Sequence, residues 1–202
     1  MSGYVNIGYA LSENQTNGQS SNSGSIFWFV DNLPPIYPLF LRDSEGNIVQ
    51  DPIFGGNQYD YGDSGRGFGA LTNSIADAHF DRNGSKRHEL NANFTFDAQI
   101  TPELSFQSKF GAQYYNNRAT SLRNPFYGSG ASQGGSLFRT DTELFVQNFL
   151  NLARYEKSFG NHSIEVLAAH ETNSFDQTFA SQSKEKAVLP YLAEFNNYII
   201  VS

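Results

Sequence analysis

The sequence contains no cysteine, which excludes disulfide bonds, thiolate chemistry and cysteine-ligated metals. Basic residues are also few, because 13 Lys and Arg stand against 20 Asp and Glu, and the formal net charge at pH 7 is −7. Nucleic acid is therefore not an expected partner, since no basic patch is available to neutralise phosphates. Apolar runs are short as well, and none approaches the roughly 18 residues that a membrane-spanning helix needs.

Patterns that would indicate catalysis or metal binding are weak. The four histidines are scattered and form no His-x-x-x-His pair, and no Gly-Lys-Ser/Thr phosphate loop occurs. Asp43, Glu45, Asn47 and Asp51 offer oxygen atoms at odd-numbered positions, as a calcium loop does, but no glutamate follows at the twelfth position. This segment is interpreted as a solvated turn. We expect no enzymatic activity, no cofactor and no metal site.

Alternation of apolar and polar residues is the dominant positive pattern, in a chain with 18 Phe and 11 Tyr. In residues 90–100 and 104–114, the even-numbered positions are mostly apolar and the odd-numbered ones mostly polar. Period two places successive side chains on opposite faces of a strand, so these segments predict a β-hairpin with one apolar and one polar face. Each arm has the length at which a tilted strand crosses a bilayer.

The whole chain predicts an all-β antiparallel meander of about five long strands. The turns are tight at 101–103 and 159–162, whereas the connections at 13–85 and 118–136 are long. Counting strands alternately up and down puts both tight turns at one end of the sheet and both long connections at the other. The expected strands are 4–14, 86–100, 104–118, 137–158 and 162–182.

Short turns at one end and long loops at the other are the layout of outer-membrane barrels. The pattern therefore predicts an incomplete transmembrane β-barrel, an open sheet with long extracellular loops. The alternation itself does not distinguish lipid from a protein core beneath the apolar face. A soluble β-sandwich that binds carbohydrate is the alternative, and a structural shell or adhesin fragment is a third.

Four short motifs occur in an order and spacing that resemble the SusC/RagA family of TonB-linked transporters of the Bacteroidetes outer membrane. The resemblance covers residues 4 to about 195 and lies within the barrel of that family. The motifs are Pro34-Pro35-Ile36-Tyr37-Pro38, Asp43 with Gly46-Asn47, Tyr59-Asp60-Tyr61-Gly62, and Asn161-His162 ahead of a strand ending at His170-Glu171.

The resemblance implies an importer of oligosaccharides or peptides in the cell outer membrane. Its implied partners are outer-membrane lipid, a SusD-like surface lipoprotein, and the TonB complex acting through a plug domain. The family's plug precedes the barrel and is not recognised in this sequence, and a barrel of this class has about 22 strands. We therefore expect residues 1–202 to be a fragment of the β-barrel domain of a TonB-dependent receptor, with the plug domain absent.

Four aromatic residues of the long connection are the candidate ligand contacts: Trp28, Tyr37, Tyr59 and Tyr61. Flat aromatic faces stack on sugar rings and on peptide side chains. The favoured alternative is that these side chains pack within the long connection itself.

Overall fold

The computed structural model describes residues 1–16, 25–32, 37–62, 72–190 and 192–201, with the side chains of Trp28 and Phe29 also left undescribed. Of the first motif, Pro34, Pro35 and Ile36 lie outside the described residues, whereas Tyr37 and Pro38 are described. The strands are β1 (Ser2–Gln15), β2 (Arg82–Gln99), β3 (Leu104–Arg123), β4 (Ser136–Phe159), β5 (His162–Ala187) and β6 (Tyr198–Val201). Short helices are α1 (Ile26–Asn32), α2 (Ser74–Phe80), η2 (Gly128–Gln133) and η3 (Phe195–Asn197).

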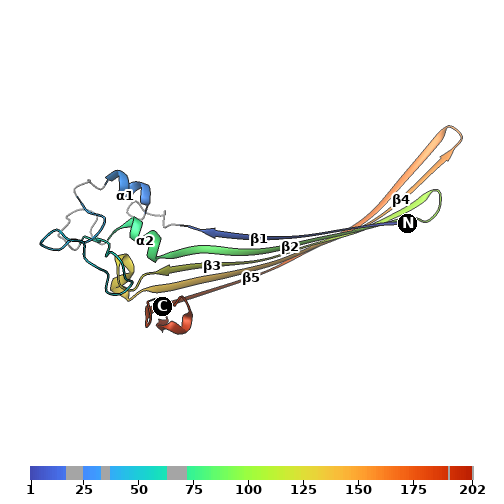
Figure 1. Ribbon diagram of the computed structural model, residues 1–202. Coiled ribbons are helices and arrows are strands. Elements are labelled where there is room, and N and C mark those ends of the chain that lie inside the picture. The colour runs from blue at the N-terminus through green and yellow to red at the C-terminus, as the bar shows by residue number, and fades with distance from the viewer. Residues whose placement is uncertain (17–24, 33–36, 63–71, 191, 202) are drawn as a thin grey trace. The chain divides into compact units, whose positions relative to one another are not determined.

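The strands form one antiparallel sheet in the order β1-β2-β3-β4-β5-β6 (Figure 1). This confirms the predicted all-β meander and its five long strands, and the sheet is open rather than closed into a barrel. The short sixth strand was not predicted. It pairs with the end of β5, with Lys184 opposite Val201 and Ala187 opposite Tyr198.

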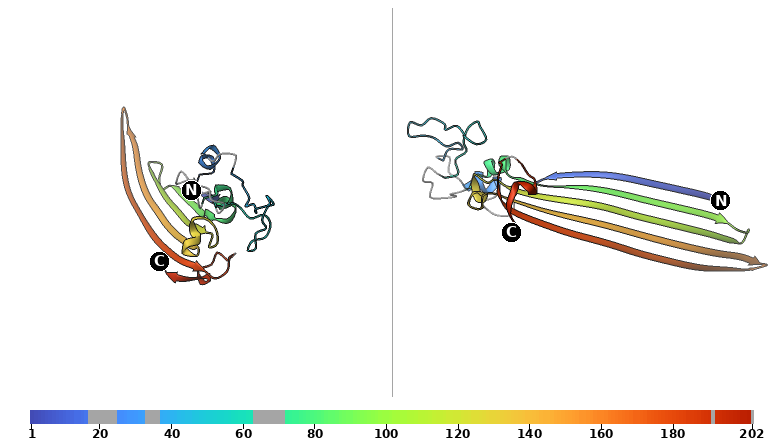
Figure 2. Two further views of the ribbon diagram at one scale, coloured as in Figure 1. Left: turned by 90° about the vertical axis from the view of Figure 1, so that its left-hand side faces the viewer. Right: turned by 90° about the horizontal axis from the view of Figure 1, so that it is seen from below.

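The chain divides into two compact units. The first, here called the strand unit, comprises Met1–Ser12, Lys86–Arg118 and Asp141–Ala180, and it carries both tight turns. The second, the loop unit, comprises Glu13–Ser85, Ala119–Thr140 and Ser181–Ser202, and it carries the long connections. Within the strand unit the long strands lie side by side in both views (Figures 1 and 2).

Side-chain contacts define the two faces of the strand unit at β2 and β3. The rings of Phe94 and Phe110 lie with their centroids 6.1 Å apart. Between them along the chain, Gln107 Nε2 donates a hydrogen bond of 2.6 Å to Asp97 Oδ1. Even-numbered residues of β2 and β3 therefore share one face, the apolar face, and odd-numbered residues share the other, the polar face. This is the predicted division.

On β4 the apolar face is formed by odd-numbered residues, and on β5 it is formed by even-numbered residues again. Arg118 on the apolar face of β3 pairs with Asp141 at 2.6 Å, so odd-numbered residues of β4 belong to that face. Gln147 Nε2 in turn donates to Ser174 Oγ at 3.0 Å, which puts even-numbered residues of β5 there too. On the polar face, Asn148 Nδ2 donates to Glu171 Oε1 at 2.7 Å.

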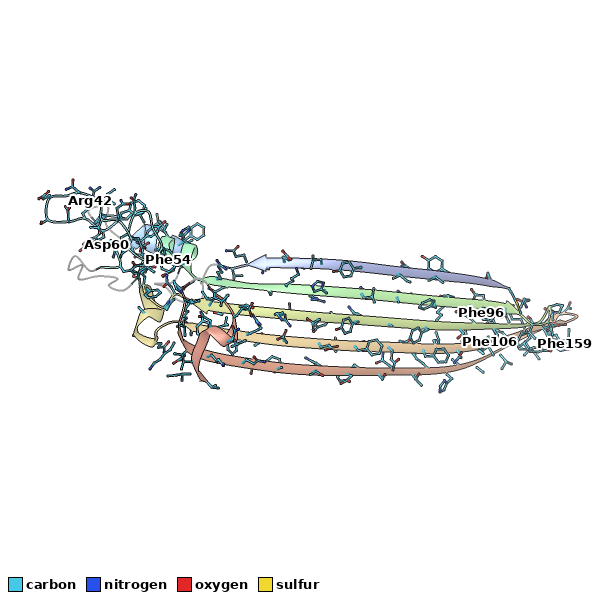
Figure 3. The ribbon with its side chains drawn as sticks, turned by 60° about the horizontal axis from the view of Figure 1, so that its bottom comes forward. Arg42, Phe54, Asp60, Phe96, Phe106 and Phe159 are labelled. Carbon is cyan, nitrogen blue, oxygen red and sulfur yellow. The ribbon has the colours of Figure 1, made fainter. Side chains whose placement is uncertain are left out.

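Large side chains on the apolar face are exposed along most of its length. The phenylalanines of β2 and β4 are roughly two-fifths exposed, and Val166 of β5 is 55% exposed. Figure 3 shows Phe96 and Phe106 on adjacent strands near the tight turns. Exposed large side chains of this face include Leu90, Phe94 and Phe96 of β2, Ile100 directly after β2, Phe145, Phe149 and Tyr155 of β4, and Ile164 and Val166 of β5.

The loop unit has a small core of its own. Leu122, Leu137 and Tyr198 are buried together, and Ala187, Ala193 and Phe195 pack against them. α2 begins at Asn73, whose side-chain oxygen accepts a hydrogen bond of 3.1 Å from the backbone N–H of Ala76. Isolated β-bridges, such as Phe40 with Tyr59, organise the described residues 40–59 before α2. The described parts of the 13–85 connection are therefore folded.

In the described part of the chain, we find no helix with the length and apolar character required to cross a membrane.

Candidate functional site

An aromatic cluster lies at the centre of the loop unit. Tyr61 stacks on Tyr127, with ring centroids 5.8 Å apart and an interplanar angle of 10°. Each hydroxyl is bound by a carboxylate: Tyr61 donates to Asp77 Oδ1 at 3.0 Å, and Tyr127 donates to Asp51 Oδ1 at 2.9 Å. The stacked rings and their two hydrogen bonds thus join three segments that are distant in sequence. Both hydroxyls have a hydrogen-bond partner, as tyrosine hydroxyls usually do when they are removed from water.

Further rings extend this cluster. Phe54 packs against Phe80 with a centroid distance of 4.6 Å. Tyr59 meets Phe80 edge-on at 5.7 Å and Phe40 at 5.0 Å. Phe80 also lies 5.9 Å from Tyr127. Tyr59 and Tyr61 therefore belong to the same continuous aromatic packing.

Buried polar side chains hold the backbone around the rings. Asp60 and Asn73 are fully buried. Asp60 Oδ1 accepts a hydrogen bond of 2.8 Å from the N–H of Gly62, and Asn73 Nδ2 donates to the Asp60 carbonyl at 3.0 Å. Asp51 Oδ1 likewise accepts from the N–H groups of Ile53 and Phe54. Such local bonds from side chain to backbone fix the path of an irregular segment. Figure 3 marks Phe54 and Asp60 in this unit.

The four predicted ligand contacts have different environments. Tyr61 is only 3% exposed, with one ring face against Tyr127. Tyr59 and Tyr37 are half-buried, and Tyr59 joins the same packing as Tyr61. Trp28 lies in α1, and its side chain is outside the described residues. Tyr59 packs within the long connection, on Phe40 and Phe80, whereas Tyr61 stacks on Tyr127 of the 118–136 connection. A ligand role for any of the four remains a prediction.

Two carboxyl groups near α2 have shifted acidity. Burial raises the pKa of Asp77 to about 6, and the charge of Asp81 acts in the same direction, against the hydrogen bond from Tyr61 and the charge of Arg123. Burial also raises the pKa of Asp81, whose carboxylate accepts a 2.8 Å hydrogen bond from the N–H of Asn124. Both groups therefore become harder to ionise on folding.

Lowering the pH from 7 to 5 should stabilise the packing of α2. A folded-state pKa raised above the unfolded value means that the folded unit binds the proton more tightly. The resulting stabilisation is fully present below the unfolded pKa of Asp77, near 3.8, and is lost as the pH rises through about 6. After correction for intrinsic rates, amide hydrogen exchange in α2 should be slower at pH 5 than at pH 7. Asp77→Asn should remove much of this difference, and an unchanged difference would contradict the assignment.

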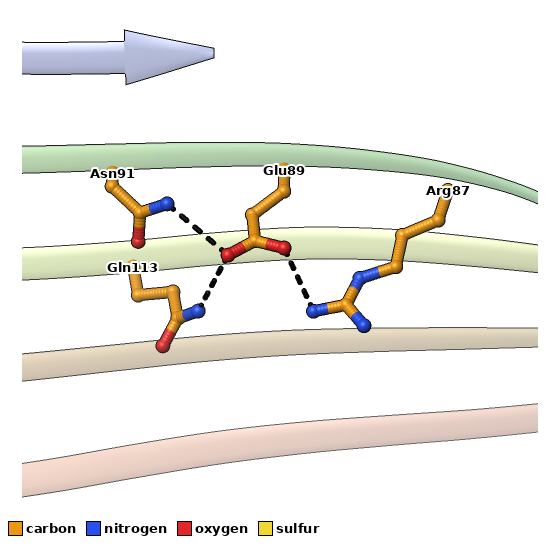
Figure 4. A network of polar contacts seen from close by, with 4 residues as sticks. All are labelled: Arg87, Glu89, Asn91 and Gln113. Carbon is orange, nitrogen blue, oxygen red and sulfur yellow. Dashed lines mark hydrogen bonds and ion pairs between the residues drawn. The ribbon is translucent and has the colours of Figure 1, made fainter. Parts of the chain in front are cut away.

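A polar network occupies the polar face of β2 and β3, and Figure 4 shows its four members. Arg87 Nη2 donates to Glu89 Oε2 at 2.8 Å. Asn91 Nδ2 and Gln113 Nε2 donate to Glu89 Oε1 at 3.1 and 2.9 Å. The Arg87 guanidinium also lies 4.4 Å from the centroid of the Tyr115 ring. The charges of Arg87 and Glu89 are thus balanced within the network.

One pattern that the sequence analysis did not recognise lies in η2. Residues 130–134 read Gly-Ala-Ser-Gln-Gly, which matches the Gly-x-Ser-x-Gly pattern of hydrolase nucleophile elbows. Such an elbow places its serine on a turn from a strand into an α-helix. Ser132 is instead an exposed residue inside a 3-10 helix. Among the described residues no group of three His, Asp or Glu is arranged to hold a metal ion.

Comparison with known proteins yields no family: neither a protein-family model nor a curated protein matches this chain.

Proposed function

We propose that the chain forms part of the outer-membrane barrel of a SusC-type, TonB-dependent importer of oligosaccharides or peptides. The observation that carries this proposal is the long, exposed apolar face of the strand unit. The phenylalanines of β2 on this face are exposed, whereas the other face of β2 and β3 carries a polar network. Contiguous apolar surface of this kind on a folded chain marks a contact with lipid or with another protein.

The dimensions of the apolar face favour lipid. Its apolar residues run in bands, from Leu90 on β2 to Ile100 directly after it, from Leu104 to Tyr114 on β3, and from Phe145 to Tyr155 on β4, where Gln147 and Asn151 interrupt them. Each band is about 11 residues long, the length at which a tilted strand crosses the hydrocarbon core. Beyond the band on β3 and β4, the same face carries the ion pair of Arg118 with Asp141. Charged pairs belong at the membrane surface rather than in its interior.

The other two features of the chain fit the same proposal. The polar face, with its Glu89 network, would line the barrel lumen, as the interiors of outer-membrane barrels are polar. The loop unit would lie on the extracellular side, where it meets substrate and a SusD-like surface lipoprotein. Energy would reach the barrel from the TonB complex through a plug domain, which the family resemblance places ahead of the barrel.

Closure of the barrel would require further strands. The sheet is open, with β1 at one edge and, at the other, β6 together with the part of β5 that precedes Lys184. Backbone N–H and C=O groups at an open edge cannot be satisfied by hydrocarbon, so a membrane-spanning sheet has to close. In this proposal the remaining strands of the receptor pair with these edges.

Site-directed spin labelling tests whether the apolar face contacts lipid. Because the chain has no cysteine, a single label can be placed at each position from 90 to 97 of β2 in turn. With these strands in a closed receptor barrel in lipid bilayers, we expect labels at Leu90, Phe94 and Phe96 to collide mainly with oxygen dissolved in the lipid. Labels at Asn91, Asn93 and Thr95 should collide mainly with a water-soluble nickel reagent. Accessibility without a two-residue period would contradict the proposal, and protection of the even positions from both reagents would favour the soluble sandwich.

A further inference from the structure

Two carboxylates at α2 bind two different segments of the loop unit. Asp77 Oδ1 accepts a hydrogen bond of 3.0 Å from the hydroxyl of Tyr61, which precedes the helix in the sequence. Asp81 Oδ1 accepts one of 2.8 Å from the N–H of Asn124, the residue directly after β3. The N–H of Asp81 also donates to the Asp77 carbonyl at 2.8 Å, which fixes the two acidic residues about one helical turn apart. α2 is therefore attached to its surroundings through two neighbouring carboxylates.

The negative charge of these two groups is only partly compensated. Asp77 and Asp81 are half-buried, and among the described residues neither forms an ion pair. The charge of Arg123 acts on both, but Arg123 is exposed, so water and salt screen it. Uptake of one proton therefore removes a repulsion between two like charges that lack a direct counter-ion.

Asp77 is the group of this cluster that takes up the proton. Tyr61 stays protonated and remains the donor, because burial and the charge of Asp77 raise the pKa of its hydroxyl. Burial, together with the charge of Asp81, raises the pKa of Asp77 to about 6. A neutral carboxyl group still accepts a hydrogen bond on its carbonyl oxygen, so protonation preserves the contact with Tyr61.

We infer that α2 is a pH-sensitive switch that controls access to the aromatic cluster around Tyr61. In mild acid Asp77 is neutral, and the helix holds Tyr61 in its stack on Tyr127. As the pH rises towards neutrality, Asp77 and Asp81 both carry a charge, and their repulsion weakens the two attachments of α2. Local opening of the helix then uncovers Tyr61, which is only 3% exposed in the closed arrangement. All these contacts lie within the loop unit, so the inference does not depend on the proposed function.

Hydroxyl-radical footprinting of the full chain in detergent micelles measures the access of solvent to Tyr61 at each pH. Tyr4, which is 63% exposed in the strand unit, serves as the internal reference. The stabilisation that the raised pKa of Asp77 provides is fully present below the unfolded pKa near 3.8, and it is lost as the pH rises through about 6. We therefore expect the oxidation of Tyr61 relative to Tyr4 to rise about tenfold from pH 5 to pH 7.

Two substitutions test the carboxylates independently of each other. Asp77→Asn fixes the neutral state, so the oxidation of Tyr61 should stay low at both pH values. Asp81→Asn leaves the hydrogen bond of Tyr61 intact but removes the neighbouring charge, so the rise should be smaller. The matched control is His79→Gln, because histidines also change charge in this pH range, and this variant should keep the full rise. Circular dichroism verifies that each variant retains its strands.

The inference fails if the oxidation of Tyr61 in the unaltered chain does not change with pH, or if the rise persists in full in both aspartate variants. Loss of the rise in His79→Gln alone would assign the switch to the histidine instead. The spin-label scan of β2 reports on the strand unit, so failure of this switch and failure of the proposed function are distinguishable.

Discussion

In the intact barrel of which this sheet would be part, Phe94→Arg should sharply reduce the fraction of protein that inserts and folds in lipid bilayers. Phe94 lies near the middle of the apolar band of β2, with its ring against Phe110. An arginine on the lipid face near the bilayer midplane costs about 2–4 kcal/mol, which is a large part of the stability of a typical fold. Phe96→Arg and Phe110→Arg should act in the same way. The folded fraction is measured by heat-modifiable migration and by protease protection in vesicles.

Asn93→Arg is the matched control for this substitution. Asn93 is the neighbouring residue, and it points to the polar face. An arginine there would enter the water-filled lumen, so the folded fraction should stay close to that of the unaltered chain. If arginine at 93 and arginine at 94 were equally tolerated, or equally harmful, the apolar face would not be the face that meets lipid.

Gly128→Ala should destabilise the aromatic cluster of the loop unit by roughly 2–4 kcal/mol, from left-handed strain and overpacking together. Gly128 has a φ of +70°, and a Cβ atom there would lie 2.9 Å from Asp77 Oδ1 and 3.0 Å from Tyr61 Cε1. Neither neighbour can move freely, because they are hydrogen-bonded to each other and Tyr61 is stacked on Tyr127. Faster amide exchange in α2 is the expected readout.

Gly55→Ala separates crowding from backbone strain. Gly55 has a similar φ of +77°, but an added Cβ would have no atom within 4 Å. Its cost should be limited to the left-handed conformation, about 1–2 kcal/mol. Equal effects at Gly55 and Gly128 would show that Tyr61 and Asp77 do not pack around Gly128 as described.

The long strands could be predicted because period two is repeated many times in them. Phe94, Phe96 and Phe110 set the apolar parity of the hairpin, and a shift of one residue would move all of them to the other face. The pairing of β6 could not be predicted in this way, since Tyr198–Val201 is too short to show a period. The same holds for α2, which covers only two turns and depends on the cap at Asn73.

The site residues were less predictable than the strands. Tyr59 and Tyr61 could be selected by residue type, but their burial depends on Tyr127 and Phe80, which lie elsewhere in the sequence. The Glu89 network was implied only by the odd parity of its members.

Sedimentation velocity of the purified chain, with and without detergent, tests whether its apolar face is a lipid-facing surface. We expect the chain to aggregate in plain buffer, because its apolar face and the edges of its open sheet are uncovered. Detergent above its micellar concentration should disperse the chain with strand content retained. A dispersed monomer in plain buffer, with a sharp and cooperative thermal transition, would contradict the barrel proposal and favour a soluble β-sandwich.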